Sequence, residues 1–343
     1  MGLIKKITIA PVYLEMEPDI DGFEGSLPYT IGQGIKLVDV NQYIQNADFS
    51  WASDALSKNR LDRFKQKWRY GLLHEYEAEE WSQSMPEAES QRLIHRAFLG
   101  LRMIRPTPKG YEYLQAQVRD VKKVEPFHFS DVEEQIFAPI IDTVNRIRIQ
   151  DAVALTHILP NLLQVNESTC LPVHLAIENL EVGYISDFVH VKQLLWVTAL
   201  DGLFTSDEWE HRGTWVATER IKHFVDPNTL IYVGVPQYLT PPNITVGAVI
   251  SDIYEARNAF AHGKWMPKKF LQKPGYGGAR GKHLTYADVL LEATSLILRT
   301  VIVKILKDDL LEFFADKQRV NDHFSKLGFV RKKKTASSRQ AWV

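Results

Sequence analysis

Cysteine is nearly absent from this chain of 343 residues, since Cys170 is the only one. A single thiol excludes an internal disulfide framework and any zinc site with several cysteines, and it fits a reducing compartment, for which the cytoplasm is the default. An excess of charge of one sign is also lacking, because 41 basic and 42 acidic side chains leave a formal net charge of -1. Any contact with RNA must therefore come from a local basic patch.

Long hydrophobic runs are missing as well. The longest apolar stretch, residues 289–314, is interrupted by charged residues, among them Glu292, Arg299 and Lys304. These charges are too many for a membrane span of about 20 apolar residues, so we expect a core helix there. Charged residues and Pro11 also interrupt the first residues before a secretory apolar core forms. We therefore expect a cytoplasmic protein without membrane contact.

Length and composition favour two domains. Hydrophobic residues make up 45% and charged residues 24% of the chain, as in folded globular proteins, and single cores seldom exceed about 250 to 300 residues. Strand and helix patterns mix before residue 130, and helical spacing alone follows. The predicted class is α+β overall. We expect a mixed α/β N-terminal domain over 1–130, an all-α helical bundle over 131–325 and a basic polar tail over 326–343.

The expected elements follow from the spacing of apolar residues. Alternation with a period of two predicts strands over 7–14 and 35–40, and β-prone residues predict strand structure over 111–124. Apolar residues three or four apart predict helices over 51–81, 87–103, 131–149, 151–164, 185–204, 207–225, 246–262 and 284–316. Prolines and glycines between the last two helices predict a long loop over 263–283.

The sharpest chemical signal lies at the end of the predicted helix 246–262, where residues 252–263 have the sequence DIYEARNAFAHG. Arg257 is a permanent cation that can fork onto two phosphate oxygens without a metal. His262 titrates in the range useful for proton transfer. On an ideal helix Asn258 lies one turn before His262, whereas Arg257 lies about 140° around the axis from it. Gly263 is well placed to end the helix in a left-handed cap.

This segment resembles the signature of the HEPN superfamily: an arginine, a polar residue, then a histidine and a glycine at the end of a bundle helix. Residues 194–203 (LLWVTALDGL) are similar to a family helix with one acidic residue, here Asp201, and residues 292–301 are similar to the closing helix with its arginine. The resemblance covers about residues 185–310, leaves out the first 130, and is closest to the Apea-like branch associated with bacterial defence.

The resemblance implies a metal-independent endoribonuclease with a toxin-like or antiviral role and no cofactor. RNA would be cut to a 2′,3′-cyclic phosphate and a 5′-hydroxyl. His262 would transfer the proton, Arg257 would bind the phosphate, Asn258 would orient His262 or the substrate, and Asp201 would orient Arg257. The resemblance also implies a homodimer in which two copies of the motif helix face one cleft. The N-terminal domain would restrain or direct cleavage, with a regulatory protein or ligand as its candidate partner.

Basic and aromatic residues crowd the predicted loop after His262. Such a mixture can hold single-stranded RNA through phosphate contacts and base stacking. A solvated loop is the alternative. The candidate RNA-binding residues are Lys264, Trp265, Lys268, Lys269, Arg280 and Lys282.

Structural alternatives exist for both central residues. His262 can be a helix-terminal histidine bonded to a carbonyl, and Arg257 can form an ion pair with Asp201 or Glu255. The same bundle can also act without turnover, as a module that binds RNA, a nucleotide or a protein partner. A purely structural role, with the motif helix as a dimer seam, is a third possibility.

Other chemistry-bearing residues give weaker patterns. His74 near Glu75 and Glu77, and His211 near two glutamates, lack the paired histidine spacing of helical zinc sites, so no metal is expected. Cys170 and His174 are four residues apart, but Pro172 between them argues against a nucleophilic dyad.

Overall fold

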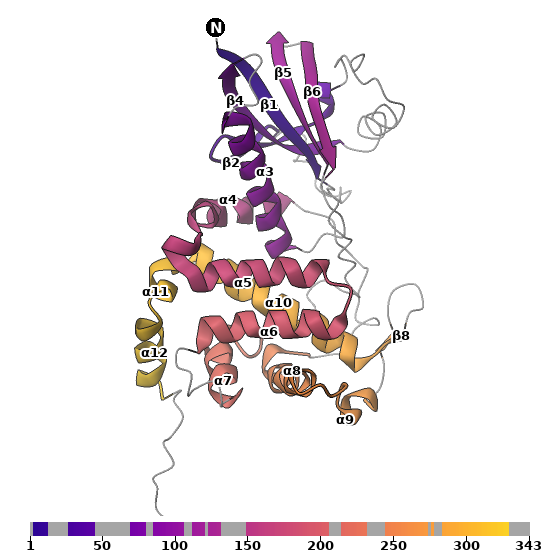
Figure 1. The fold of residues 1–343 in the computed structure, drawn as a ribbon, viewed down its shortest axis with the longest axis vertical. Helices are drawn as coiled ribbons and strands as arrows, with labels where there is room; N and C mark the ends of the chain where they lie inside the picture. The colour runs from indigo at the N-terminus through magenta and orange to yellow at the C-terminus, as the bar shows by residue number, and fades with distance from the viewer. Residues whose placement is uncertain are drawn as a thin grey trace, which may run out of the picture. The chain divides into compact units, whose positions relative to one another are not determined.

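The computed structural model describes residues 3–12, 27–44, 69–79, 85–105, 112–120, 123–131, 149–205, 214–231, 244–273, 276–277 and 283–328 (Figure 1). The chain divides into two compact units. Unit 1 comprises Met1–Val165 with Ile302–Asp309, and unit 2 comprises Asn166–Val301 with Leu310–Val343. This division falls after the boundary expected near residue 130. The fold class is α+β, as predicted.

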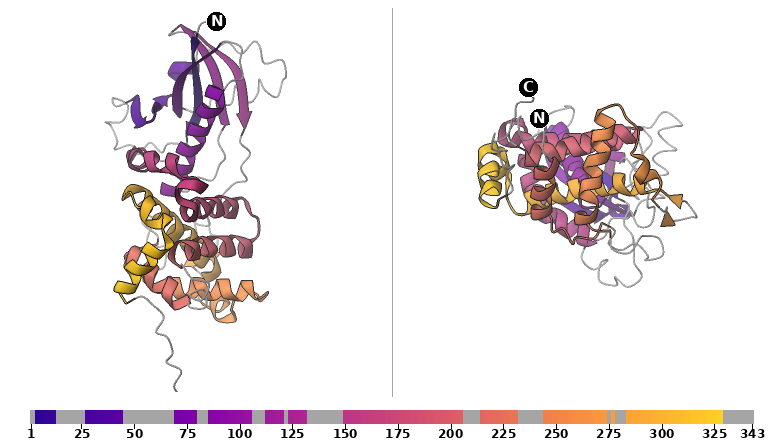
Figure 2. Two further views of the ribbon diagram at one scale, coloured as in Figure 1. Left: turned by 60° about the vertical axis from the view of Figure 1, so that its left-hand side comes forward. Right: turned by 90° about the horizontal axis from the view of Figure 1, so that it is seen from below.

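Unit 1 contains a six-stranded sheet in the order β2-β3-β4-β1-β5-β6. The neighbouring strands pair antiparallel, and the views in Figures 1 and 2 show the strands side by side. The central strand β1 is buried from Lys6 to Val12. The strands are β1 (Leu3–Val12), β2 (Tyr29–Gly32), β3 (Ile35–Asp39), β4 (Tyr70–Glu79), β5 (Glu112–Asp120) and β6 (Lys123–Asp131).

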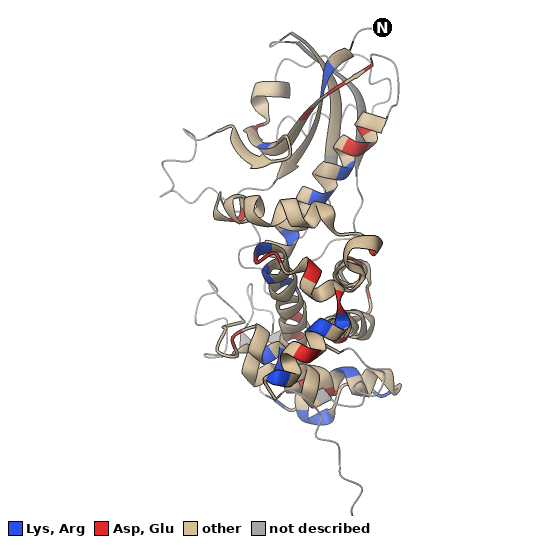
Figure 3. Cartoon of the chain, turned by 90° about the vertical axis from the view of Figure 1, so that its left-hand side faces the viewer, with Lys and Arg blue, Asp and Glu red and all other residues tan. Residues whose placement is uncertain are grey.

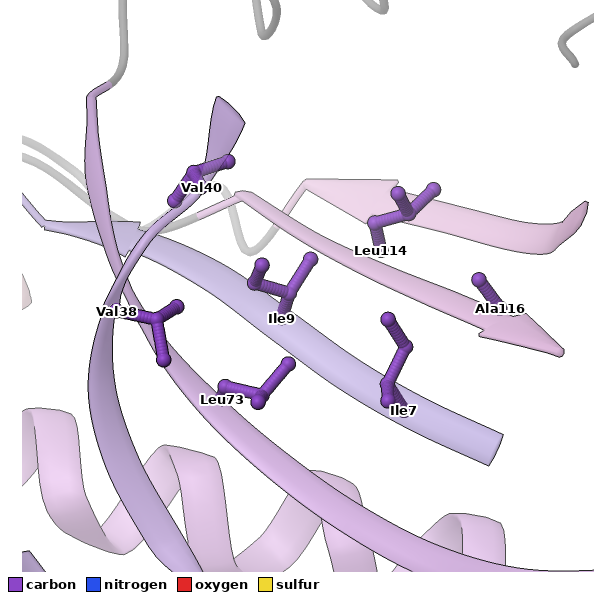
Figure 4. Packing of buried hydrophobic residues seen from close by; sticks show 7 residues of the cluster. All are labelled: Ile7, Ile9, Val38, Val40, Leu73, Leu114 and Ala116. Atoms are coloured by element: carbon purple, nitrogen blue, oxygen red, sulfur yellow. The ribbon is translucent and has the colours of Figure 1, made fainter. Parts of the chain in front are cut away.

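Strand β1 sends its side chains alternately to the two faces of the sheet. On one face, Ile7 and Ile9 join a buried hydrophobic cluster, drawn in Figure 4, with Val38, Val40, Leu73, Leu114 and Ala116. On the other face, Lys6 and Thr8 meet helix α3 (Met85–Ile104). Lys6 Nζ lies 2.5 Å from Glu87 Oε1, and Ser90 Oγ donates to Thr8 Oγ1 at 2.7 Å. These polar groups tolerate burial because each is paired.

Four predictions in unit 1 need comment. The predicted strands 7–14 and 35–40 are present as β1 and β3, over their described residues. The helix predicted over 51–81 is wrong where β4 occurs, and residues 51–68 lie outside the described part. Residues 70–73 are all buried, and such a run fits either period, so pairing with β1 and β3 decided for a strand. Strand β2 was missed, and the described residues of the predicted region 111–124 belong to the paired strands β5 and β6.

The predicted C-terminal helices are largely present. Helix α4 (Ile149–Gln164) belongs to unit 1, and the segment 132–148, predicted as helical, lies outside the described residues. Unit 2 contains α5 (Glu167–Ile185), α6 (Val189–Phe204), α7 (Thr214–Phe224), α8 (Val246–Ala261), α9 (Lys268–Leu271), most of α10 (Tyr286–Lys307), α11 (Leu311–Ala315) and α12 (Lys317–Lys326), with a short β7–β8 pair (Tyr276–Gly277 and His283–Leu284). Helices α5 and α12 were not predicted.

Helices α5 and α6 lie side by side, as Figure 1 shows. Trp196 of α6 is buried, and its Nε1 donates to Leu180 O of α5 at 3.2 Å. A Cβ added to Gly183 would lie 2.2 Å from Nε1 of Trp196. The indole therefore uses the space that a glycine leaves, and this contact fixes α6 against α5.

Charged residues of both signs are interspersed along the helices (Figure 3). This mixture agrees with the near-zero net charge of the sequence. Within the described ranges, no helix combines the length and the apolar character that a membrane crossing requires.

Candidate active site at the end of helix α8

Helix α8 carries the motif residues, and local hydrogen bonds cap both of its ends. The side chain of Thr245 accepts a bond from Ala248 N at 3.3 Å. At the other end His262 is the C-cap, and Gly263 follows with φ of +66°. Gly263 N donates to Phe260 O and Lys264 N to Ala259 O, the two bonds of a Schellman motif. The predicted helix 246–262 and its left-handed glycine cap are both confirmed.

Arg257 lies against helix α6. Its Nη2 donates to Asp201 Oδ2 at 2.5 Å, and the hydroxyl of Tyr254 donates to Asp201 Oδ1 at 2.9 Å. The side chains of Arg257 and Asp201 are 20% and 16% exposed, whereas Tyr254 is fully buried. The guanidinium carbon also lies 5.5 Å from the centre of the Tyr254 ring. The structure thus brings Asp201 to Arg257 and adds Tyr254 to the pair.

The surroundings of Tyr254 keep its hydroxyl protonated, and those of Arg257 leave several of its N–H groups without a partner among the described residues. Burial raises the pKa of Tyr254 well above 10, and the neighbouring charge of Asp201 raises it further. The tyrosine therefore remains a hydrogen-bond donor at neutral pH. Nη2 is the one guanidinium nitrogen of Arg257 that bonds to a described residue, and Nε is buried without a hydrogen-bond partner among those residues. The arginine is oriented, yet most of its N–H groups are uncommitted.

His262 and Asn258 have different surroundings from Arg257. His262 is exposed, Asn258 is half-buried, and neither side chain forms a hydrogen bond with a described residue. No hydrogen bond links His262 to Arg257 either, in agreement with the wide angle between them on the helix. The structural alternative for His262 was a hydrogen bond from the imidazole to a carbonyl. Among the described residues the imidazole has no such partner. One protomer therefore presents an oriented cation and an exposed imidazole separately.

The basic residues after His262 fall into two groups. Lys269 pairs with Glu255 at 2.6 Å and Lys273 with Asp252 at 2.9 Å, so both fasten their segment to α8. Tyr286 of α10 also donates to Asp252, at 2.7 Å. Lys264 and Lys268, from the predicted RNA-binding set, are exposed without an ion pair to any described residue, and Trp265 is 76% exposed. The two remaining members, Arg280 and Lys282, lie outside the described part.

Two polar residues of this region were not found from the sequence. Tyr254 stands three residues before Arg257 and thus on the same helix face, a spacing that offered a signal. Gln193 of α6 offered none: its Nε2 donates to Thr294 Oγ1 of α10 at 3.0 Å and to Ile253 O of α8 at 3.4 Å. It ties three helices together in the interior. Arg299, the arginine of the predicted closing helix, is buried.

Among the described residues, the weaker candidates do not form a second site. Cys170 is buried, and burial raises the pKa of its thiol, which disfavours a nucleophile. His174 Nε2 instead lies 3.3 Å from Glu178 Oε1. His74 Nδ1 lies 2.8 Å from Ser90 Oγ within unit 1, while His211 and its neighbouring glutamates lie outside the described residues. In the ranges that the structure describes, no group of three or more histidine, cysteine, aspartate or glutamate side chains is arranged for a metal.

Comparison with protein-family models, with curated proteins and with solved structures found no match.

Proposed function

We propose that the chain is a metal-independent endoribonuclease of the HEPN type whose site lies at the C-terminal end of α8. The observation that carries the proposal is the contact between Asp201 and Arg257, which orients a guanidinium on the same helix that ends at the exposed His262. A fixed cation and a free imidazole are the two groups that cleavage through the 2′-hydroxyl requires. A toxin-like or defence role and a cytoplasmic location belong to the same proposal.

The reaction forms one bond and breaks one bond. The 2′-oxygen attacks the adjacent phosphorus, the bond to the 5′-oxygen breaks, and the products are a 2′,3′-cyclic phosphate and a 5′-hydroxyl. One histidine takes the proton of the 2′-hydroxyl, and a second gives a proton to the leaving oxygen. Arg257 stabilises the charge on the phosphoryl oxygens, and Asn258 orients His262 or the substrate.

A homodimer supplies the second histidine and brings an imidazole close to Arg257. Because Arg257 and His262 of one protomer have separate surroundings, an efficient site needs the partner subunit's His262 near the Arg257 of the first protomer. The two α8 ends would then face one cleft. The exposed Lys264, Trp265 and Lys268 would contact RNA at its rim, through phosphates and base stacking.

Incubation of total RNA with the purified full chain tests the proposal. We expect cleavage with cyclic phosphate ends that is insensitive to chelators, and a loss of at least about a hundredfold in His262→Ala and Arg257→Ala, the size of one proton-transfer or charge-stabilising contribution. The matched controls are His157→Ala and Arg92→Ala, both exposed in unit 1. Wild-type protein that leaves RNA intact, or equal cleavage by all variants, would contradict the proposal.

Mixing the two inactive variants tests the shared site. Mixed dimers of Arg257→Ala and His262→Ala contain one intact arginine and one intact histidine on different subunits. We expect cleavage above that of either variant alone but well below wild type, because the single intact histidine assists only one of the two proton transfers, together with a dimer in sedimentation experiments. Monomers with full activity would contradict the dimeric arrangement.

A non-catalytic module is the second candidate, because the contact of Arg257 with Asp201 can equally be a structural ion pair. That function predicts RNA binding with no cleavage by the wild type or by His262→Ala. For RNA binding itself, Lys264→Gln and Lys268→Gln should weaken affinity and reduce its salt dependence, whereas Lys269→Gln, already paired with Glu255, should change affinity less.

A further inference from the structure

The hydroxyl of Tyr254 has no role in the reaction as proposed, yet it occupies half of the carboxylate that holds Arg257. Asp201 Oδ1 accepts the bond from Tyr254, and Asp201 Oδ2 accepts the bond from Arg257. Tyr254 and Arg257 are one turn apart on α8, and Asp201 stands opposite on α6. The two oxygens of the carboxylate thus accept bonds from two different residues of α8.

This division matters because guanidinium and carboxylate groups favour a forked contact with two parallel bonds. In a forked pair, Asp201 would engage two nitrogens of Arg257 and neutralise it more completely. Here the arginine gives Asp201 one bond, through Nη2. The Tyr254 hydroxyl keeps Oδ1 engaged, and its ring lies under the guanidinium and limits sideways movement.

We infer that Tyr254 is a positioning residue that holds Asp201 in a single-bond contact with Arg257, so that the guanidinium is oriented but retains donors for a phosphodiester. The inference rests on the proposed function and deepens it. Without the hydroxyl, Asp201 Oδ1 loses the donor that holds it apart from Arg257, and a second bond from the guanidinium to this oxygen would withdraw the cation from the substrate.

Tyr254→Phe is the direct test because it removes the hydroxyl and keeps the ring. The matched control is Tyr286→Phe, which removes a similar bond to Asp252 of the same helix, away from Arg257. Affinity is measured with a single-stranded 2′-O-methyl RNA, which cannot be cleaved, and kcat and KM with the same sequence bearing 2′-hydroxyls. We expect Tyr254→Phe to lose about tenfold in affinity, the size of one charge-assisted hydrogen bond, and Tyr286→Phe to change it less than about twofold.

A double-mutant cycle shows whether Tyr254 acts through Asp201. In an Asp201→Ala background Tyr254→Phe should have no further effect, since no carboxylate remains to rotate. An unchanged Tyr254→Phe, or an equal loss in the Asp201→Ala background, overturns the inference and leaves the ribonuclease proposal standing. Wild-type protein that neither binds nor cleaves RNA overturns the proposed function, and the inference with it.

Asp201→Asn gives a second test that does not depend on the folding of Tyr254→Phe. The amide oxygen still accepts a bond from Tyr254, but the negative charge beside Arg257 is gone. We expect RNA affinity to be kept or increased while kcat falls about tenfold or more. The reason is that Arg257 no longer has an ion pair to neutralise it, but it has also lost the contact that orients it. If Asp201 had only a structural role, Asp201→Asn would lower stability without separating the change in affinity from the change in kcat. An unchanged kcat would overturn the inference.

Discussion

At the scale of single residues, His74 of β4 is a half-buried polar group whose surroundings favour its neutral form. Its Nδ1 lies 2.8 Å from Ser90 Oγ, and its ring stacks on Tyr76. Burial lowers the pKa of His74 below 6.5, and the charges of Glu89 and Glu75 oppose this only in part. Burial likewise lowers the pKa of His95 on α3. The fold therefore disfavours protonation on both sides of the β4–α3 contact.

We expect unit 1 to lose stability as the pH falls. Because the folded pKa of His74 is lower than the unfolded one, its contribution is complete above about pH 6.5 and is lost as the pH falls below that value, where the unfolded chain takes up the proton first. Hydrogen exchange of α3 amides, compared at pH 7.5 and 5.5, measures the effect. His74→Gln should flatten the pH dependence and His157→Gln, exposed on α4, should not; equal slopes in all three proteins would refute the expectation.

The candidate site also shows how far individual residues could be read from the sequence. Arg257, Asn258 and His262 were found because their spacing is local and lies at a recognisable helix end. Tyr254 and Gln193 were missed because their roles depend on partners far along the chain: Tyr254 bonds to a residue 53 positions away, and Gln193 to one 101 positions away.

At the scale of elements, the contact between α5 and α6 depends on one glycine. A Cβ at Gly183 would meet Trp196 at 2.2 Å, whereas a Cβ at Gly202 of α6 would meet no atom within 4 Å. We expect Gly183→Ala to destabilise the chain by about 1–3 kcal/mol through overpacking, and Gly202→Ala to stabilise it by about 0.5–1 kcal/mol through helix propensity. Chemical denaturation followed by tryptophan fluorescence measures both. A similar effect of the two alanines would contradict this account.

Helix α5 also explains why an element escaped prediction. The helix contains Pro172, and proline within a helix removes a backbone donor and clashes with the preceding turn. The chain avoids that conflict with a non-helical residue at Cys170 (φ -156°, ψ 81°). Pro172 then lies near the start of the following helical segment, where its fixed φ is tolerated. Strand β4 was mistaken for a helix because its run of consecutive buried residues fits the helical period as well as the strand period.

At the scale of the whole molecule, the two compact units do not follow the order of the sequence. Ile302–Asp309, which includes the end of α10, belongs to unit 1, and Asn161 Nδ2 of α4 donates to Leu306 O there at 2.7 Å. Ile302, Ile305 and Leu306 are fully buried. A boundary read from helix spacing alone could not find this, since α10 has one continuous helical pattern.

This arrangement predicts the behaviour of a fragment that begins at Asn166. It carries Ile302–Asp309 without α4, so we expect it to keep helical circular dichroism but to bind the dye ANS and melt with less cooperativity than the full chain. Ile302→Gln in the fragment should reduce dye binding. A fragment that melts as sharply as the full chain and binds no dye would contradict the expectation.

The sequence by itself determined the α+β class, helix α8 with its glycine cap, and the placement of a cation and an imidazole at the end of that helix. Each of these depends on neighbours within about one or two helical turns, so a short pattern suffices. The tertiary structure decided that residues 70–79 form a strand and that Tyr254 shares the carboxylate of Asp201 with Arg257. These depend on which distant segments supply hydrogen-bond partners, and no local pattern contains that information.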